Sequence, residues 1–283
     1  MKIGAIIQAR ISSTRLPRKV LKELPYGSRI TVLQQIIRRL KKSNKIKEII
    51  VATTKNKGDR EIIKIAKKED VKWFKGSEYD VLGRFYLAAK ENNLDIIVRI
   101  TGDCPCIDPK VVDLVIDKHL KSNSDYTSNI LKRTFPHGLD TEVLNFNALK
   151  KAYSEAKEDF EREHVCPYIH KSKPHLFKIT NVKAPANLCA PDIRITLDTE
   201  EDYALLCLVF DYLYSKNNAF KTIDLIHLFK EKPWIGYINK GIIQKKALKT
   251  LNEEIAEAIR VLDLQGLHKA KKLLKTIKLE ESK

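Results

Sequence analysis

Strand-like and helix-like segments alternate along the first half of this 283-residue chain, and that alternation limits its possible folds more than any other feature. Short apolar runs predict buried strands, and the amphipathic runs between them predict helices. The predicted strands are Ile3–Gln8, Glu48–Thr53, Val71–Phe74 and Asp95–Thr101; the predicted helices are Thr31–Lys42, Asp59–Glu69, Tyr79–Asn92 and Pro109–Ser122. The pattern predicts an α/β fold with a mostly parallel central sheet and helices on both faces.

Parallel sheets of this kind bind ligands beyond the carboxyl ends of their strands, where the strand order reverses. The segments that follow Gln8, Thr53 and Thr101 are therefore the places where we expect a functional site.

The second half is less regular. Asp125–Glu142 is predicted to be extended and loop-like. Predicted helices are Phe146–Lys157, Phe160–Lys171 and Glu200–Lys216, and predicted strands are Phe177–Val182 and Arg194–Leu197. After residue 240 the pattern changes to helical spacing among many charges, at Leu248, Leu251, Ile255, Ile259 and Leu262, followed by a predicted helix at Leu267–Leu279. We predict one domain over residues 1–240 and a basic helical tail over 241–283, packed on the domain or on a partner subunit.

The chain is strongly basic, with 53 Lys and Arg against 36 Asp and Glu and a net charge of +17. Such a charge fits nucleic acid, an anionic membrane or a small polyanion as a partner, and it also fits a lysine-rich proteome. No apolar run is long enough for a membrane span, and five cysteines without CxxC spacing do not predict a disulfide framework or a zinc site. We expect a cytoplasmic protein that binds neither membrane nor specific nucleic acid.

The loop after the first predicted strand is the first candidate site. Residues 8–19 contain Arg10, Arg15, Arg18, Lys19 and three hydroxyl residues. Backbone N–H groups, hydroxyls and guanidinium groups at a strand end can hold a triphosphate, although the loop lacks the P-loop pattern. The alternative is a solvated basic loop.

Asp103 is the second candidate, because it follows the predicted strand Asp95–Thr101 directly. A carboxylate there can bind Mg²⁺ beside phosphates, and Gly102 allows close approach. The alternative is a turn or helix-capping role, for which Asp108 is better placed.

Six motifs in register resemble one family. They are Gln8-Ala9-Arg10-x-x-Ser13-Thr14-Arg15-Leu16-Pro17-x-Lys19, Val51-Ala52-Thr53, Gly76-Ser77-x-x-Asp80-Val81-Leu82-x-Arg84, Arg99-Ile100-Thr101-Gly102-Asp103, Gly138-Leu139-Asp140-x-Glu142 with Arg162-Glu163-His164-Val165, and Arg194-x-Thr196-x-Asp198-Thr199-x-x-Asp202. The set resembles the CMP-sugar-acid synthetases, including the CMP-Kdo and CMP-sialic acid synthetases. It is most similar to the cytidylyltransferase-like family named after a spore-coat polysaccharide biosynthesis protein. The resemblance covers about residues 1–210 and not the tail.

The resemblance implies a nucleotide-diphospho-sugar transferase fold over residues 1–240. It implies attack by an acceptor oxygen on the α-phosphate of CTP, with Mg²⁺ as cofactor and pyrophosphate as leaving group. Arg10, Lys19 and Asp103 are the implied catalytic residues, and Asp103 and Asp198 the implied metal ligands. The implied nucleotide-binding residues are Gln8, Ala9, Arg10, Ser13, Thr14, Arg15, Lys19, Thr53, Asp80, Arg84 and Thr101. The family usually has glycine where this chain has Arg18, which either adds charge at the phosphates or turns to solvent.

We predict the acceptor pocket at Asp140 and Glu142, whose carboxylates suit sugar hydroxyls, and at Arg162 and His164, which offer a guanidinium for an anionic group and a titratable imidazole. The alternative for the last two is a helix surface with ordinary ion pairs. Arg99 lies in an apolar strand and needs a partner, either Asp103 or a bound anion. Asp198 has a second interpretation as the cap of the helix at Glu200–Lys216, a role that Thr199 can also fill.

Three other functions stay open. One is a glycosyltransferase that uses a nucleotide sugar, although no Asp-x-Asp motif lies near Asp103. Another is a basic nucleic-acid-binding protein, although no aromatic stacking platform accompanies the charge. The third is a catalytically silent relative that serves as a subunit. The acceptor itself is open among nonulosonic acids, octulosonic acids, phosphonates and other small anions, and a homodimer is possible.

Overall fold

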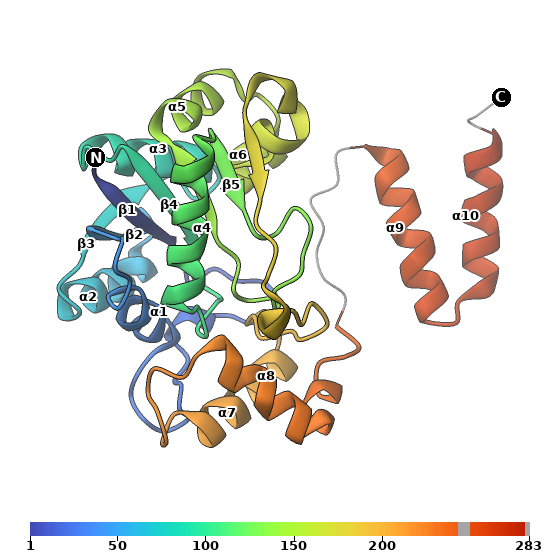
Figure 1. Ribbon diagram of the computed structural model, residues 1–283. Helices are drawn as coiled ribbons and strands as arrows, with labels where there is room; N and C mark the ends of the chain where they lie inside the picture. Colours follow the sequence, from blue (N-terminus) through green and yellow to red (C-terminus); the bar gives the residue numbers. More distant parts are fainter. Residues whose placement is uncertain (243–249, 281–283) are drawn as a thin grey trace. The chain divides into compact units, whose positions relative to one another are not determined.

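A seven-stranded sheet forms the centre of residues 1–240 in the computed structural model, which describes residues 1–242 and 250–280 (Figure 1). The strand order is β3-β2-β1-β4-β6-β5-β7, with β1 to β4 mutually parallel, β6 antiparallel to both neighbours and β7 parallel to β5. The strands are β1 Ile3–Gln8, β2 Glu48–Thr54, β3 Lys72–Gly76, β4 Ile96–Thr101, β5 Tyr126–Ser128, β6 Glu142–Asn145 and β7 Ile179–Asn181. The predicted mostly parallel sheet is confirmed.

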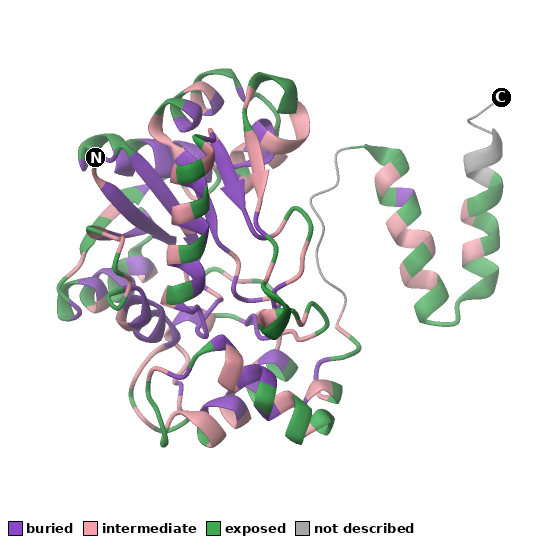
Figure 2. Ribbon diagram, in the orientation of Figure 1, coloured by how far each residue is buried: buried purple, intermediate pink, exposed green. Residues whose placement is uncertain are grey.

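Helices cover both faces of the sheet, as predicted (Figure 1). Strand β1 explains why: Ala5 and Ile7 enter the core beneath α1, α2, α4, α7 and α8, whereas Ile6 enters the core beneath α3 and α5. A strand buried on both faces shows as continuous burial in Figure 2. The helices are α1 Val32–Leu40, α2 Arg60–Lys68, α3 Val81–Glu91, α4 Pro109–Ser122, α5 Phe146–Glu155, α6 Asp159–His164, α7 Glu200–Leu213 and α8 Thr222–Glu231.

Helix caps decide two alternatives that the sequence left open. Asp108 caps α4 by accepting a hydrogen bond from the Lys110 amide at 2.9 Å. Thr199 caps α7 by accepting one from the Asp202 amide at 3.3 Å. Neither Asp103 nor Asp198 is therefore the N-cap of these helices.

The single helix predicted over Phe160–Lys171 is wrong. Helix α6 ends at His164, and a π-helical turn occupies Tyr168–Ser172. Between them Val165 has φ 73° and ψ −58°, with the Cys166 amide donating to the His164 carbonyl at 2.9 Å. This is a strained γ-turn. Pro167 supplies the reason, because proline disfavours helical geometry at the preceding residue and cannot donate a helical hydrogen bond.

The strand predicted at Arg194–Leu197 is also wrong, and α8 was not predicted. The segment forms only an isolated bridge between His137 and Arg194. The amide of Ile195 donates to the His137 carbonyl, and the amide of Leu197 donates to the Asp103 carbonyl, both at 2.8 Å. The segment is apolar enough for a strand, but its hydrogen bonds go to loops.

Residues Gly241–Lys283 form a second compact unit. Its described part is a hairpin of α9 (Leu251–Leu264) and α10 (His268–Glu280). Gly266, at φ 68°, ends α9, and the Leu267 amide returns to the Leu262 carbonyl at 2.8 Å. Leu248, expected in the helical pattern, lies outside the described residues. No helix within residues 1–242 and 250–280 has the length and apolarity needed to cross a bilayer.

Candidate active site

The strand order reverses beside β1, because β2 and β3 lie on one side of it and β4 on the other. Loops that leave β1 and β4 therefore diverge and open a crevice at their carboxyl ends. Gly102 brings these ends together, since a Cβ atom there would lie 2.7 Å from the Gln8 carbonyl oxygen. The fold thus places Asp103 beside the loop at residues 8–19.

Lys19 joins two carboxylates at this crevice. Its Nζ lies 2.9 Å from Asp103 Oδ2 and 3.0 Å from Asp198 Oδ1. The Thr101 hydroxyl donates to Asp103 Oδ1 at 2.5 Å, and Arg15 lies 3.4 Å from Asp198. Five predicted site residues, from three separate parts of the chain, therefore meet in one cluster.

Electrostatics hold the cluster in its charged form. Burial would raise the pKa of Asp103, but the attraction of Lys19 and hydrogen bonds from Thr101 and Lys19 lower that pKa well below its usual range. Burial would lower the pKa of Lys19, but Asp103 and Asp198 raise it above its usual value. The site therefore presents the Lys19 ammonium group beside an ionised Asp103 carboxylate at neutral pH.

Arg194 and Asp202 complete the cluster, and the sequence did not identify them as site residues. Arg194 donates to both carboxylate oxygens of Asp202, at 2.9 and 2.7 Å, and to Asp198 Oδ2 at 3.0 Å. The Asp198 amide also donates to Asp202 at 2.9 Å. The motif Arg194-x-Thr196-x-Asp198-Thr199-x-x-Asp202 already contained both residues. Arg194 and Asp202, at its two ends, position the carboxylate of Asp198 between them.

The donor set fits a magnesium ion shared with phosphates. Mg²⁺ commonly takes one or two carboxylates and completes its octahedron with water and substrate phosphate. Asp103 and Asp198 both approach Lys19 Nζ and so offer two such oxygens. Within residues 1–242 and 250–280, no group of three or more His, Cys, Asp or Glu side chains could hold a metal ion by itself.

Asp59, which the sequence did not identify as a site residue, anchors the loop at residues 8–19. Its buried carboxylate accepts hydrogen bonds from the Ile11 amide at 2.9 Å and from both threonine hydroxyls at the end of β2. Thr53, a predicted nucleotide ligand, is one of these donors and is fully buried. Arg18 takes the left-handed conformation (φ 58°) that glycine favours, and its half-exposed guanidinium pairs with Glu61 at 2.7 Å.

The rest of the loop carries polar groups around Glu78. Arg10 lies 3.7 Å from Glu78, and the Ser12 hydroxyl also donates to that carboxylate. Gln8, at the end of β1, has a buried Oε1 with no hydrogen-bond partner in the described part of the chain. Ser13 and Thr14 lie in the same loop, and the Ala9 amide donates to the Ala52 carbonyl at 3.1 Å.

Arg84 is a buried cation for which the described residues supply no ion pair or hydrogen bond. It is 2% exposed, and its Nε and Nη1 make no hydrogen bond to any residue that the structure describes. Burial lowers its pKa to about 10, and repulsion from Arg10 contributes. The nearby carboxylates Asp59, Glu78 and Asp80 are each engaged by other donors. A buried guanidinium left unpaired is costly, so Arg84 is a strong candidate for an anion-binding residue.

Arg162 and Asp80, which were assigned to different ligands, bind each other. Arg162 donates to both oxygens of Asp80, at 3.0 and 2.6 Å, and to two carbonyls near α5. Both residues line a pocket of about 620 Å³ together with Arg10. The other lining residues are Glu78, Tyr79, Asp159 and Glu163. The pocket thus joins the loop at residues 8–19 to α6.

Asp140, a predicted acceptor residue, forms an ion pair with Arg133. It accepts two hydrogen bonds from Arg133, at 2.6 and 2.9 Å. His164, the last residue of α6, is partly buried, and burial lowers its pKa.

Glu142 is buried and bonds to Arg99 through Oε2 and to the Tyr126 hydroxyl, at 2.6 Å, through Oε1. The expected partners of Arg99, Asp103 or a bound anion, are therefore wrong, because antiparallel pairing of β4 with β6 places Glu142 directly opposite.

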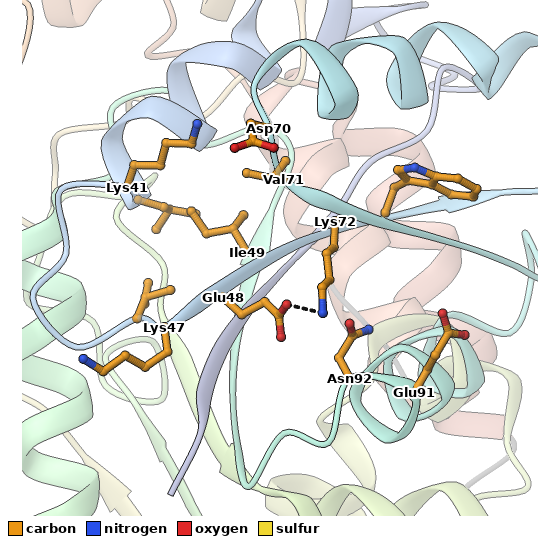
Figure 3. A pocket seen from close by; sticks show the side chains of 12 residues that line it. Lys41, Lys47, Glu48, Ile49, Asp70, Val71, Lys72, Glu91 and Asn92 are labelled. Carbon is orange, nitrogen blue, oxygen red and sulfur yellow. Dashed lines mark ion pairs between the residues drawn. The ribbon is translucent and has the colours of Figure 1, made fainter.

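A larger pocket of about 860 Å³ lies at the other end of the sheet, where β2 and β3 begin (Figure 3). Glu48, one of the three carboxylates that line it, pairs with Lys2 and Lys72. The pocket lies away from the carboxyl ends of the strands and contains none of the predicted site residues. Size therefore does not identify the site, whereas strand topology does.

Comparison with known proteins decides the family. A sequence model of the cytidylyltransferases matches residues 4–234. The chain belongs to the cytidylyltransferase family. It is 36% identical over 230 residues to the spore coat polysaccharide biosynthesis protein SpsF of Bacillus subtilis, covering 81% of this chain and 94% of that one. The predicted resemblance and the predicted class of enzyme, a nucleotidyltransferase, are confirmed.

Two further relatives support the same family. A cytidylyltransferase structure from Leptospira borgpetersenii has a TM-score of 0.78 at 38% identity, with 87% of this chain covering 100% of that one. The 3-deoxy-manno-octulosonate cytidylyltransferase of Solibacter usitatus is 32% identical over 117 residues, 41% of this chain and 44% of that protein. The family model ends at residue 234, so the hairpin of α9 and α10 lies outside the residues that match the family.

Proposed function

We propose that this cytidylyltransferase joins CMP from CTP to a sugar acid or a related small anionic acceptor and releases pyrophosphate. The observation that carries the proposal is the Lys19 ammonium group between Asp103 and Asp198, beside an arginine-rich loop at the point where the strand order reverses. Cations and carboxylates in this arrangement suit a triphosphate and its metal ion.

The cationic and the anionic residues of the site have different proposed roles. Arg10, Arg15 and Lys19 would neutralise the triphosphate and the departing pyrophosphate, which lowers the barrier because negative charge accumulates there. Asp103 and Asp198 would hold Mg²⁺, which supplies further neutralisation of the phosphate oxygens. The pocket lined by Arg10, Asp80 and Arg162 would orient the acceptor oxygen toward the α-phosphorus.

The relatives support the type of acceptor. The names of two relatives connect them with polysaccharide biosynthesis and with an octulosonate sugar acid. A carboxylate acceptor of this kind pairs naturally with guanidinium groups. Arg84 is a second cation for that purpose, since its donors lack protein partners in the described residues.

The test is a thermal-stability screen with CTP, UTP, ATP and GTP, each with and without Mg²⁺, followed by pyrophosphate release with candidate acceptors. Binding to the folded state raises stability by RT ln(1 + [L]/Kd). We expect a rise with CTP that Mg²⁺ enlarges, and pyrophosphate release only with an anionic sugar acceptor. A rise with another nucleotide alone would reject CTP as the substrate. No rise with any nucleotide would reject the proposal.

Replacing Arg84 by methionine should stabilise the free protein and weaken nucleotide or acceptor binding. Methionine keeps the apolar stem and removes an unpaired buried charge, which should raise the free energy of unfolding by about 1–3 kcal/mol. Melting temperature should therefore rise by roughly 2–4 °C per kcal/mol. Affinity for CTP or for the acceptor should fall at least about tenfold, measured by calorimetry.

Arg39→Met is the matched control. Arg39 is equally buried, and its Nε and Nη2 also lack hydrogen-bond partners in the described residues, but its Nη1 donates to the Phe220 carbonyl at 2.9 Å and its guanidinium stacks on the Phe220 ring. The control should lower the melting temperature and leave ligand affinity unchanged. If Arg84→Met also lowers the melting temperature, Arg84 has a structural partner and is not a ligand-binding cation.

A further inference from the structure

The described part of the tail unit leaves several large apolar side chains exposed. Among its described side chains, at residues 250–276, only Ile255 is buried. Leu251, Leu264, Leu267 and Leu273 are 51–64% exposed. A two-helix unit of this length lacks the core that stabilises a domain, and most helical stability comes from packing of an apolar face.

The sequence of the hairpin has the spacing of a helical bundle. Leu251, Ile255, Ala258 and Leu262 follow one another at intervals of four, three and four residues along α9. Ala270 and Leu274, both in α10, follow Leu267 at intervals of three and four residues. These intervals form the seam of left-handed helix packing. Leu264 and Leu273 lie outside the two seams and are exposed, so apolar surface is left over.

The charges of the two helices are opposite. Helix α9 contains Glu253, Glu254, Glu257 and Asp263 against Arg260 alone. Helix α10 contains Lys269, Lys271, Lys272, Lys275 and Lys278 against Glu280 alone. One pair, Lys271 with Asp263, already joins the helices of a single hairpin. A twofold axis would place α9 of one copy against α10 of the other, and so bring opposite charges together twice.

We propose that the tail hairpin is a self-association module that pairs with the hairpin of a second copy of this chain to form a four-helix bundle. The symmetric bundle covers the leftover leucines and matches the acidic helix with the basic helix. An anionic membrane is the weaker partner, because the acidic side chains of α9 would be repelled from it. The hairpin lies beyond the residues that match the family, so association is a property added to the enzyme domain.

The test compares matched variants of the full chain by light scattering coupled to size exclusion. Leu264→Glu changes the last residue of α9 and Gln265→Glu changes its C-cap, and Leu273→Glu and Thr276→Glu lie three residues apart on α10. All four residues are exposed and each variant adds one negative charge. We expect each leucine variant to raise the dissociation constant of the wild-type oligomer at least about tenfold, because an apolar side chain leaves the bundle. The two controls should keep the wild-type mass, and pyrophosphate release per subunit should be the same in all five proteins.

Three results would overturn the proposal. The first is a monomeric wild-type protein. The second is an oligomer whose mass the leucine variants do not change, which would place association elsewhere in the chain. A leucine variant that changes the melting temperature but not the mass would count as the same result. The third is flotation of the wild-type protein, and not of the leucine variants, with phosphatidylglycerol vesicles, which would make the hairpin a lipid-binding element.

Discussion

Asp103→Asn should fold normally and lose pyrophosphate release by about 1,000-fold or more. An amide cannot supply the negative charge that holds a divalent cation beside the triphosphate, and a loss of about 4 kcal/mol of transition-state stabilisation corresponds to this factor. The substitution keeps the shape of the side chain, so the hydrogen bond from Thr101 can persist. Turnover is measured at saturating CTP, Mg²⁺ and acceptor.

Asp108→Asn is the control for this prediction. Asp108 lies five residues further on and is buried, where it caps α4 and accepts two hydrogen bonds from Thr222. We expect that variant to lower the melting temperature and to keep its turnover. Full activity of Asp103→Asn would remove Asp103 from the metal site. Equal loss in both variants would mean that the effect comes from local structure.

Glu142→Gln should destabilise the fold by about 3–5 kcal/mol, the usual effect of removing one partner from a buried ion pair. Burial would lower the pKa of Arg99, but the attraction of Glu142 raises it, so Arg99 keeps its charge in the core. Without the carboxylate, that buried charge has lost its counterion. Melting temperature should fall by roughly 2–4 °C for each kcal/mol lost.

Glu61→Gln is the matched control, because the Arg18–Glu61 pair is the same chemistry with both side chains about half exposed. We expect its free energy of unfolding to change by less than about 0.5 kcal/mol. The double variant Arg99→Met with Glu142→Leu should recover most of the lost stability. Similar melting temperatures for Glu142→Gln and Glu61→Gln would contradict the prediction. Activity of Glu142→Gln, assayed well below its melting temperature, tests the separate assignment of Glu142 to the acceptor pocket.

Local sequence predicted the elements of the sheet well, because a strand that is buried on both faces has a continuous run of apolar residues. The runs at β1, β2 and β4 and the proline-initiated helix α4 are examples. The prediction failed at Phe160–Lys171, where apolar periodicity continues although Pro167 ends the helical hydrogen bonding. It also failed at Arg194–Leu197, because the sequence of a strand does not say whether a neighbouring strand will accept it.

The chain's sequence alone determined the fold class, the arginine-rich loop and the carboxylate at Asp103, since motif spacing and strand ends are local properties. Tertiary structure decided which side chains meet. Only the folded chain brings Lys19 to Asp198, pairs Arg99 with Glu142 rather than Asp103, and leaves Arg84 without a protein partner in the described residues. The physical reason is that ion pairs between distant segments depend on strand order and register, and those are set by burial of the whole sheet rather than by any single segment.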